Sequence, residues 1–228
     1  MTPARKTQKA TSGTRHDAVD DGTRGQLTKE RILNATARIL TDRGYAGTRL
    51  RDIAKLAEVQ APAIYYYFTS REELIELVVS RGQRAAREHV ERGLTDLPSG
   101  TAPIERLRCA VEAHLRIVLE LSGFTTAAIR NAGQLPEAMR ARIQAEHRSY
   151  GELWQKLFVD AQAAGEIRSD VNPTYARLLI LGALNWSPEW WSSKLGNVED
   201  LAAVSAALIG GLIPTPESAL LPDGTSAG

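Results

Sequence analysis

The stretch from Thr48 to Phe68, TRLRDIAKLAEVQAPAIYYYF, constrains the fold more than any other part of this chain. It reads as two short helix-sized segments separated by a tight break. Apolar residues recur at three- and four-residue steps in the first segment, so this segment has one apolar face. These residues are Leu50, Ile53, Ala54 and Ala57. Thr48 stands where its hydroxyl would cap the first helical turn.

The second segment begins near Pro62, whose missing N–H is harmless in the first turn of a helix. Ile64 and Phe68 lie four residues apart and give this helix a core face, while Tyr65 and Tyr66 point outward. Two short helices that meet at a steep angle over a short turn make a helix-turn-helix, and its second helix can enter the major groove of DNA. The stretch therefore predicts a DNA-binding unit.

A longer segment, Leu27 to Leu77, resembles the DNA-binding domain of the tetracycline-repressor (TetR) family of bacterial transcription regulators. The resemblance rests on the runs ERILNATARILTDRGYAGT, RDIAKLAEV and IYYYFTSREEL. It implies an all-α fold, in which a three-helix helix-turn-helix DNA-binding domain is followed by a six-helix effector-binding and dimerisation domain. Glu58 stands where the family usually has a glycine in the turn, and Gln60 where a capping serine is common. These departures leave the operator sequence open.

The same resemblance indicates which side chains contact DNA. It places Gln60, the two residues after it and Tyr65 near base edges, and Gln60 is able to pair with adenine. The remaining side chains are expected at phosphates, apart from Arg51, which could reach a guanine. The predicted set is Thr48, Arg49, Arg51, Gln60, Ala61, Pro62, Tyr65, Tyr66, Tyr67 and Arg71. The alternative is that the tyrosines pack within the three-helix unit, as we expect for Tyr67.

The charge distribution agrees with DNA contact at one end of the chain. The formal net charge of the 228 residues is only +1. Residues 1–71 carry 13 Lys and Arg against 7 Asp and Glu, whereas residues 72–228 carry 15 against 20. A basic N-terminal third joined to a mildly acidic remainder suits a protein that touches phosphate with one end only.

Cysteine usage and hydropathy bear on where the protein acts. A single cysteine, Cys109, argues against an internal disulfide framework and favours a reducing cytosol. No run approaches the roughly 18–20 apolar residues needed to span a bilayer, and the N-terminal residues lack the apolar core of a signal peptide. We therefore expect a cytoplasmic protein without a membrane partner.

Composition divides the chain into four parts. Residues 1–26 have almost nothing to bury and are expected to form a disordered basic tail. A basic arm that reaches DNA is the alternative for this segment. Residues 27–71 are expected to form the DNA-binding domain, residues 72–213 the ligand-binding and dimerisation domain, and residues 214–228 a flexible tail.

Start and stop signals locate the helices. Thr28 is expected to open the first helix and Gly44 to end it. Ser70 can cap a long helix that runs to about Leu94 and links the two domains, and Asn172 can cap a later one. Further helices are expected at about residues 104–121, 124–132, 136–164, 174–191 and 198–212.

An aromatic cluster marks the C-terminal half, since all four tryptophans lie between residues 154 and 191. Large aromatics on adjacent helices could wall a cavity for an apolar ligand, although core packing and a dimer interface account better for any single one. The TetR resemblance implies such a pocket, and a homodimer through the eighth and ninth helices. The run LGALNWSPEWW is also similar to a segment of family members that respond to acyl-CoA-type lipids. The predicted pocket residues are Leu115, Phe124, Arg130, His147, Tyr150, Trp154, Asn185 and Trp186.

Three functional hypotheses follow from these patterns. The first is a ligand-responsive repressor that binds a palindromic double-stranded operator and is released by a hydrophobic small molecule, such as an acyl-CoA or lipid-like compound. The second is a DNA-binding factor of the same fold without an effector. The third is a helical lipid-binding protein or enzyme with a vestigial DNA-binding region, and the retained Arg49, Arg51 and Arg71 argue against it. The sequence has no recognisable catalytic, cofactor or metal motif, so no enzyme activity and no cofactor are expected.

Overall fold

The chain is helical throughout the part that the structure describes. The computed structural model describes residues 14–213, and these form nine α-helices and one π-helical turn, with no strand. The elements are α1 (Thr14–Gly47), α2 (Leu50–Leu56), α3 (Ala61–Tyr67), α4 (Arg71–Thr95), α5 (Pro103–Arg116), the π-helical turn η1 (Ile117–Leu121), α6 (Gly123–Asn131), α7 (Glu137–Ala163), α8 (Pro173–Trp190) and α9 (Val198–Gly210). The predicted all-α fold is confirmed. Of the two predicted tails, 1–26 and 214–228, residues 1–13 and 214–228 lie outside the described residues.

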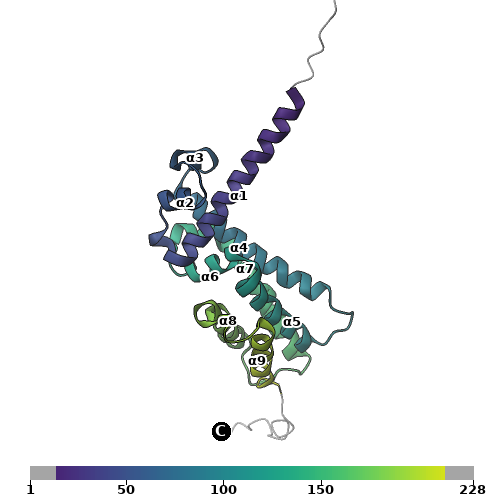
Figure 1. The fold of residues 1–228 in the computed structure, drawn as a ribbon. Helices are drawn as coiled ribbons and strands as arrows, with labels where there is room; N and C mark the ends of the chain where they lie inside the picture. Colours follow the sequence, from purple (N-terminus) through teal and green to yellow (C-terminus); the bar gives the residue numbers. More distant parts are fainter. Residues whose placement is uncertain (1–13, 214–228) are drawn as a thin grey trace, which may run out of the picture.

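The first helix begins earlier than predicted. The helix starts at Thr14. The predicted disorder is therefore wrong for residues 14–26, and the predicted helix start at Thr28 is wrong as well. Thr28 lies inside α1, where its hydroxyl donates to the carbonyl oxygen of Arg24 at 3.0 Å. Once the buried part of a helix has formed, each further residue adds a hydrogen bond, and the two glycines of this segment weaken it by only about 1 kcal/mol each. Figure 1 shows this part of α1 running past α3 and away from the other helices.

Local capping signals place other helix ends correctly. The Ser70 hydroxyl accepts from the backbone N–H of Glu73 at 3.0 Å and caps α4. The Asn172 side chain accepts from two backbone N–H groups in the first turn of α8. Gly44 ends the regular part of α1, because its φ of 68° lies in the left-handed region that favours glycine.

Helix α4 connects two hydrophobic clusters. Its first half, including Leu74 and Val78, packs in a cluster with α1, α2, α3, α6 and the start of α7. Its later turns, including Val90 and Leu94, pack in a second cluster with α5, α7, α8 and α9. Because α6 belongs to the first cluster, the packing does not break at the predicted domain boundary between residues 71 and 72.

Helix α3 and the last two helices lie at opposite ends of the molecule. Figure 1 shows α3 at one end and α8 with α9 at the other, with α4 running between them. Since a helix rises about 1.5 Å per residue, the 25 residues of α4 span roughly 38 Å. A displacement at one end of this helix can therefore reach the other.

Candidate DNA-contacting surface and ligand cavity

Helix α3 presents an exposed face made of residues that the sequence predicts at DNA. The exposed residues at its start and along this face are Gln60, Ala61, Pro62, Tyr65 and Tyr66. Tyr66 is 84% exposed. Ile64 is buried and fixes the opposite face, and Tyr67 packs against the same core, as predicted. The face is thus free to meet a duplex.

The turn between α2 and α3 is held by α1. Glu58 in this turn has a φ of 53°, a conformation in which glycine is the usual residue. The guanidinium of Arg31 on α1 donates to the carbonyl oxygens of Ala57 and Glu58, and it lies 3.7 Å from the Glu58 carboxylate. These bonds satisfy carbonyl groups at the end of α2. Sequence reasoning missed Arg31, because the local pattern of α1 does not show which neighbour it meets.

Two residues predicted to contact phosphate are used inside the DNA-binding unit instead. Thr48 is 1% exposed and its hydroxyl donates to the Gly44 carbonyl oxygen at 2.8 Å, so the N-cap residue of α2 is Arg49. Arg71 donates from Nε to the Thr48 carbonyl oxygen at 2.6 Å and from Nη2 to that of Tyr45. Its guanidinium carbon also lies 4.5 Å from the centre of the Tyr45 ring. Arg71 therefore anchors α4 to the residues before α2.

Two cations beside α2 remain available to phosphate. Arg49 is exposed, and the side chain of Arg51 is 71% exposed. Arg51 lies 3.7 Å from Asp52, but the shorter bond of Asp52, at 2.8 Å, goes to Arg43. Of the predicted set, Arg49 and Arg51 are therefore the cations best placed for phosphate contacts.

A cavity of about 320 Å³ lies between α4, α5, α6, α7 and α8. Most of its wall is apolar or backbone: Gly82 and Ala86 come from α4, Ala128 and Ile129 from α6, and Leu181 from α8. Small-molecule sites are typically clefts of about 300–1,000 Å³ with apolar walls and a few polar groups. The cavity therefore has the size and character of a small-molecule site.

Three of the eight predicted pocket residues line this cavity, namely His147, Tyr150 and Asn185. Leu115 and Trp154 are not among the lining residues, and both are fully buried in the second hydrophobic cluster. Their size and apolar character suit a core as well as a pocket, so sequence alone does not separate the two roles.

The other three predicted pocket residues face elsewhere. Phe124 lies under the Arg81 guanidinium, whose carbon is 4.4 Å from the ring centre. Arg130 pairs with Glu189 at 2.8 Å. Trp186 is 64% exposed on α8. The prediction for Trp186 is wrong because α8 is apolar nearly all round, so its sequence does not show which face meets the cavity.

His114 is a cavity residue that the predicted pocket set lacks. It is 1% exposed, and its Nδ1 lies 2.8 Å from the hydroxyl oxygen of Tyr150. Burial lowers the pKa of His114 to about 4, a decrease that neighbouring Asn185 opposes in part, and burial also raises the pKa of Tyr150. Both side chains are therefore uncharged near neutral pH. A buried histidine that is satisfied by a neighbour is commoner than one that contacts a ligand, so the sequence does not assign His114 to the pocket.

The buried histidine predicts a loss of stability in acid. In the unfolded chain His114 binds a proton near pH 6.5, whereas in the folded protein it does so only near pH 4. The stability linked to its neutral form is present above pH 6.5 and is lost as the pH falls through 4. We expect this residue to lower the free energy of unfolding by about 2–3 kcal/mol between pH 7 and pH 4.5. Urea unfolding at both pH values measures this change.

The control for this prediction is the double variant His114→Phe with Tyr150→Phe. It removes the titrating ring and leaves no buried hydroxyl without its partner. The double variant should lose less stability in acid than the wild type does. The same pH dependence in both proteins would contradict the prediction.

The cationic side chain of Arg177 lies where α7 and α8 meet the cavity. Arg177 lines the cavity, and its Nε donates to Oε1 of Gln155 at 2.9 Å. Gly151 lies beside this guanidinium, since a Cβ at its position would be 3.4 Å from Nη1 of Arg177. In the part of the chain that the structure describes, no acidic group lies within ion-pair distance of Arg177. An anionic group of a ligand would supply that partner.

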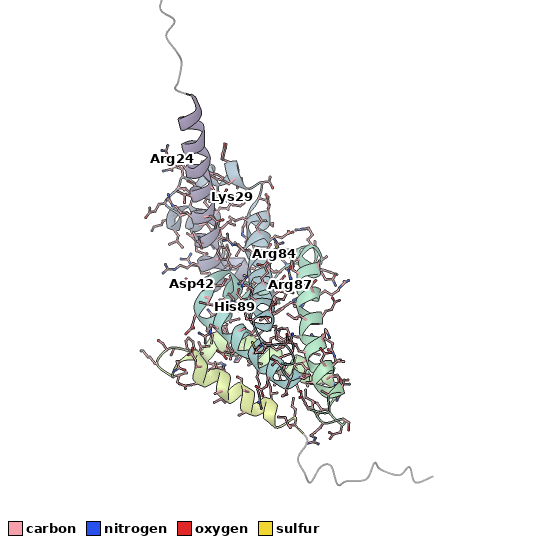
Figure 2. The ribbon with its side chains drawn as sticks, turned by 90° about the vertical axis from the view of Figure 1, so that its right-hand side faces the viewer. Arg24, Lys29, Asp42, Arg84, Arg87 and His89 are labelled. Carbon is pink, nitrogen blue, oxygen red and sulfur yellow. The ribbon has the colours of Figure 1, made fainter. Side chains whose placement is uncertain are left out.

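Ion pairs fix α4 against α7 beside the cavity. Arg84 and Arg87 project from α4, as Figure 2 shows, and bond to the carboxylate of Glu146 on α7 at 3.2 Å and 3.4 Å. A further pair joins Arg142 of α7 to Glu76 of α4 at 2.7 Å. Partly exposed pairs contribute little stability singly, but together these fix how the two cavity walls lie against each other.

Helices α8 and α9 carry large exposed apolar side chains. These are Tyr175, Leu178, Leu179, Trp186 and Trp190 on α8, with Val204 and Leu208 on α9. Leu179 is 75% exposed. Large apolar groups gathered on the surface of a globular protein mark an interaction site. We call these seven residues the α8–α9 surface.

Two other kinds of site are not found in the described range. Residues 14–213 contain no group of three or more histidine, cysteine, aspartate or glutamate side chains that could hold a metal ion. None of the helices in this range is long and apolar enough to cross a membrane.

Two family models match the chain. Residues 32–78 match the model of bacterial regulatory proteins of the tetR family, and residues 100–209 match the model of the tetracyclin repressor-like C-terminal domain. The first covers most of the DNA-binding unit, and the second covers four of the five helices around the cavity. Together the two models span more than half of the chain.

Individual relatives agree with these models. The HTH-type transcriptional regulator UidR of Escherichia coli (strain K12) is 25% identical over 194 residues, which are 84% of this chain and 95% of UidR. The HTH-type transcriptional repressor KstR of Rhodococcus jostii (strain RHA1) is 28% identical over 167 residues, or 73% of this chain and 70% of KstR. Among solved structures, AibR in complex with isovaleryl coenzyme A and operator DNA aligns with a TM-score of 0.71 at 26% identity, over 82% of this chain and 98% of that chain.

Proposed function

Because this chain belongs to the TetR family of DNA-binding transcriptional regulators, we propose that it is a ligand-responsive repressor. In this proposal, a homodimer binds a palindromic operator and a hydrophobic small molecule of the acyl-CoA or lipid-like class releases it. The observation that carries the proposal is the apolar cavity between α4 and α6, since both helices also pack against the DNA-binding unit. The complex of AibR with isovaleryl coenzyme A and operator DNA supports the proposed pairing of effector and operator.

Helix α6 supplies a physical link from the cavity to the DNA-binding unit. Thr125 and Ala128 line the cavity, and the Thr125 hydroxyl donates to the Gly82 carbonyl oxygen of α4 at 3.0 Å. The Asn131 side chain, at the other end of α6, donates to the Leu40 carbonyl oxygen of α1 at 2.9 Å. A ligand that displaces α6 would therefore move α1 and α4 together. It shifts the equilibrium only as far as it binds the released conformer better than the DNA-bound one.

The cavity suits the tail of an anionic amphiphile. A volume of about 320 Å³ is within the range of small-molecule sites and can take the acyl chain of a lipid-like molecule. Arg177 at the wall is available to a carboxylate or phosphate of the same molecule. An acyl-CoA ester combines these two features.

We propose that the α8–α9 surface joins two subunits. Its exposed apolar side chains would be covered by the same surface of a second copy, in a two-fold symmetric interface. The two α3 helices would then reach half-sites about one helical turn apart, roughly 34–36 Å.

Operator selection followed by effector titration tests the proposed function. Duplexes that the wild-type protein retains from a random-sequence pool should share a palindromic motif. Adding octanoyl-CoA should then release the protein from such a duplex in a fluorescence anisotropy titration. A pool without a shared motif would refute specific DNA binding. Retention of the duplex in the presence of every saturated ester from four to twelve carbons, and of the corresponding free acids, would refute the effector class.

Two substitutions should separate affinity from specificity at the DNA surface. Arg49→Ala should weaken binding to all duplexes alike and reduce the slope of log K against log salt by about one, because one phosphate contact is lost. Gln60→Ala should instead relax the base preference at one operator position and leave the salt slope unchanged. Anisotropy titrations at several salt concentrations on matched duplexes measure both effects. A Gln60→Ala protein that selects the wild-type motif would remove Gln60 from base readout.

A further inference from the structure

We propose that the cavity selects an effector whose apolar chain carries a hydroxyl group, and that His114 and Gln83 bind this group. The proposal deepens the function proposed above and rests on it. A saturated hydrocarbon chain would fill the same space without meeting these two polar side chains.

His114 has one ring nitrogen left for a ligand. Its Nδ1 is paired with the Tyr150 hydroxyl at 2.8 Å, whereas its buried Nε2 makes no hydrogen bond of normal geometry in the described part of the chain, although the side chain of Asn185 lies near enough to raise the pKa of His114. When the Tyr150 hydroxyl donates to Nδ1, Nε2 carries the hydrogen and can donate to a ligand oxygen. When Nδ1 donates to Tyr150 instead, Nε2 can accept from a ligand hydroxyl. In both tautomers, His114 offers one hydrogen bond beside the cavity.

Gln83, which lines both this cavity and the neighbouring depression beside α7, holds a second buried atom without a partner in the described range. It follows Gly82 on α4, and its Oε1 is buried without a hydrogen-bond partner among the described residues. A buried polar atom that lacks a partner destabilises the unliganded protein. An apolar cavity with two such atoms in its wall is typical of a site that binds a polar group.

The charges of these groups indicate which oxygen they bind. His114 is neutral, and the Gln83 amide oxygen only accepts hydrogen bonds, so neither compensates a carboxylate. The negative charge of the effector belongs at Arg177 instead. A hydroxyl group both donates and accepts, so it can satisfy an amide oxygen and a histidine N–H. A keto oxygen can satisfy only the histidine.

Isothermal titration of the full-length protein with matched ligands tests this inference. The probes are octanoyl-CoA, 3-oxooctanoyl-CoA and three hydroxyoctanoyl-CoA esters, with the hydroxyl on carbon 3, 5 or 8. We expect the best hydroxylated ester to bind about tenfold more tightly than octanoyl-CoA, with the keto ester between them. A preference of less than fivefold overturns the proposal. The same series as free acids shows whether the charge at Arg177 comes from a carboxylate or from the phosphates of coenzyme A.

Two variants remove the polar site without leaving an orphaned partner. Gln83→Leu and the double variant His114→Phe with Tyr150→Phe should each reduce the hydroxyl preference to less than threefold. The matched control is Gln144→Leu, because Gln144 is exposed on α7 and lines a neighbouring depression rather than the cavity. This control should keep the full preference. Retention of the preference in Gln83→Leu would remove Gln83 from the site.

The thermal stability of unliganded Gln83→Leu separates binding from a structural role. Oε1 of Gln83 has no partner among the described residues that the substitution would remove. The melting temperature of the Gln83→Leu protein should therefore equal or exceed that of the wild type. A lower melting temperature would show that Gln83 stabilises the fold and would overturn its assignment.

Failure of this inference and failure of the proposed function give different results. Equal binding of saturated and hydroxylated esters overturns the hydroxyl site and leaves an acyl-CoA-responsive repressor. If no ester or acid binds while the protein still retains its duplex, the effector class and the hydroxyl site both fail. If no duplex is retained, the repressor function fails, and the ligand titrations still decide the hydroxyl site.

Discussion

Replacing Gly82 with alanine is expected to lower the free energy of unfolding by about 3 kcal/mol. A Cβ at this position would overlap sterically with the carbonyl oxygen of Phe124. It would also lie 2.6 Å from the carbonyl carbon of that residue and 2.9 Å from Cβ of Ala128. The obstacle is the backbone of α6, which cannot move aside as the end of a long side chain can. Helices α4 and α6 would have to separate, and urea unfolding measures the resulting loss of stability.

Gly93 on the same helix provides the matched control. A Cβ there would lie 3.5 Å from Sγ of Cys109 and 3.7 Å from Cβ of Ala113, which are ordinary contacts. Alanine is favoured over glycine inside a helix by about 1 kcal/mol, so Gly93→Ala should be as stable as the wild type or more stable. A Gly82→Ala protein with wild-type stability would show that α4 and α6 are not closely packed at this point.

The Gly82 contact also has a functional consequence. Gly82 lines the cavity and its carbonyl oxygen accepts the hydrogen bond from Thr125, so forcing α4 away from α6 alters the cavity wall. Under the proposed mechanism, the same displacement uncouples the effector from α1. A Gly82→Ala protein that still folds is therefore expected to retain DNA binding and to respond poorly to the effector.

Replacing Leu179 with glutamate is expected to convert the proposed dimer to a monomer and to weaken operator binding by about a hundredfold or more. Leu179 is 75% exposed on α8 and does not line the cavity. Burying a carboxylate in an apolar interface without a partner is strongly unfavourable, and two-fold symmetry introduces the charge twice. A monomer would bind each half-site separately and would lose the gain that comes from linking the two recognition helices. Light scattering coupled to gel filtration measures the mass, and anisotropy on the selected duplex measures the affinity.

The control for this substitution is Leu77→Glu. Leu77 is also an exposed leucine, at 42%, but it lies on α4 rather than on the α8–α9 surface. The Leu77→Glu protein should remain a dimer. If Leu179→Glu remains a dimer at micromolar concentration, the two subunits meet through another surface.

Much of the helical framework could be predicted because its signals are local. The side chains of Ser70 and Asn172 cap the helices that directly follow them, and Gly44 ends a helix through its own φ. Each signal acts within one turn of the chain, so it depends little on what packs nearby. The exposed tyrosines of α3 follow in the same way, since Ile64 and Phe68 fix the buried face of that short helix.

The predicted roles of several single residues failed where distant contacts decide them. Arg71 and Thr48 carry polar groups that suit phosphate, but carbonyl oxygens at the end of α1 and directly after it accept their hydrogen bonds. Trp186 suits a pocket by its size, yet it faces outward from α8. His114 gives no signal in the sequence and becomes a cavity residue only because Tyr150 on α7 lies against it. Thr48 bonds to a carbonyl oxygen only four residues away, whereas the partners of Arg71 and His114 come from segments far away in the sequence.

The sequence by itself determined that this protein is an all-α, TetR-like chain with a DNA-reading helix near its N-terminus. The helices follow from periodicity, capping and turn residues, which act between neighbours along the chain, and the TetR-like character follows from the resemblance of the sequence between Leu27 and Leu77 to that family. Only the tertiary structure decided that a cavity forms between α4, α5, α6, α7 and α8, and which polar atoms in it lack partners. The physical reason is that the faces of an apolar helix are equivalent until other helices cover some of them. Burial, which gives His114 and Gln83 their chemistry, is a property of that packing and not of either residue type.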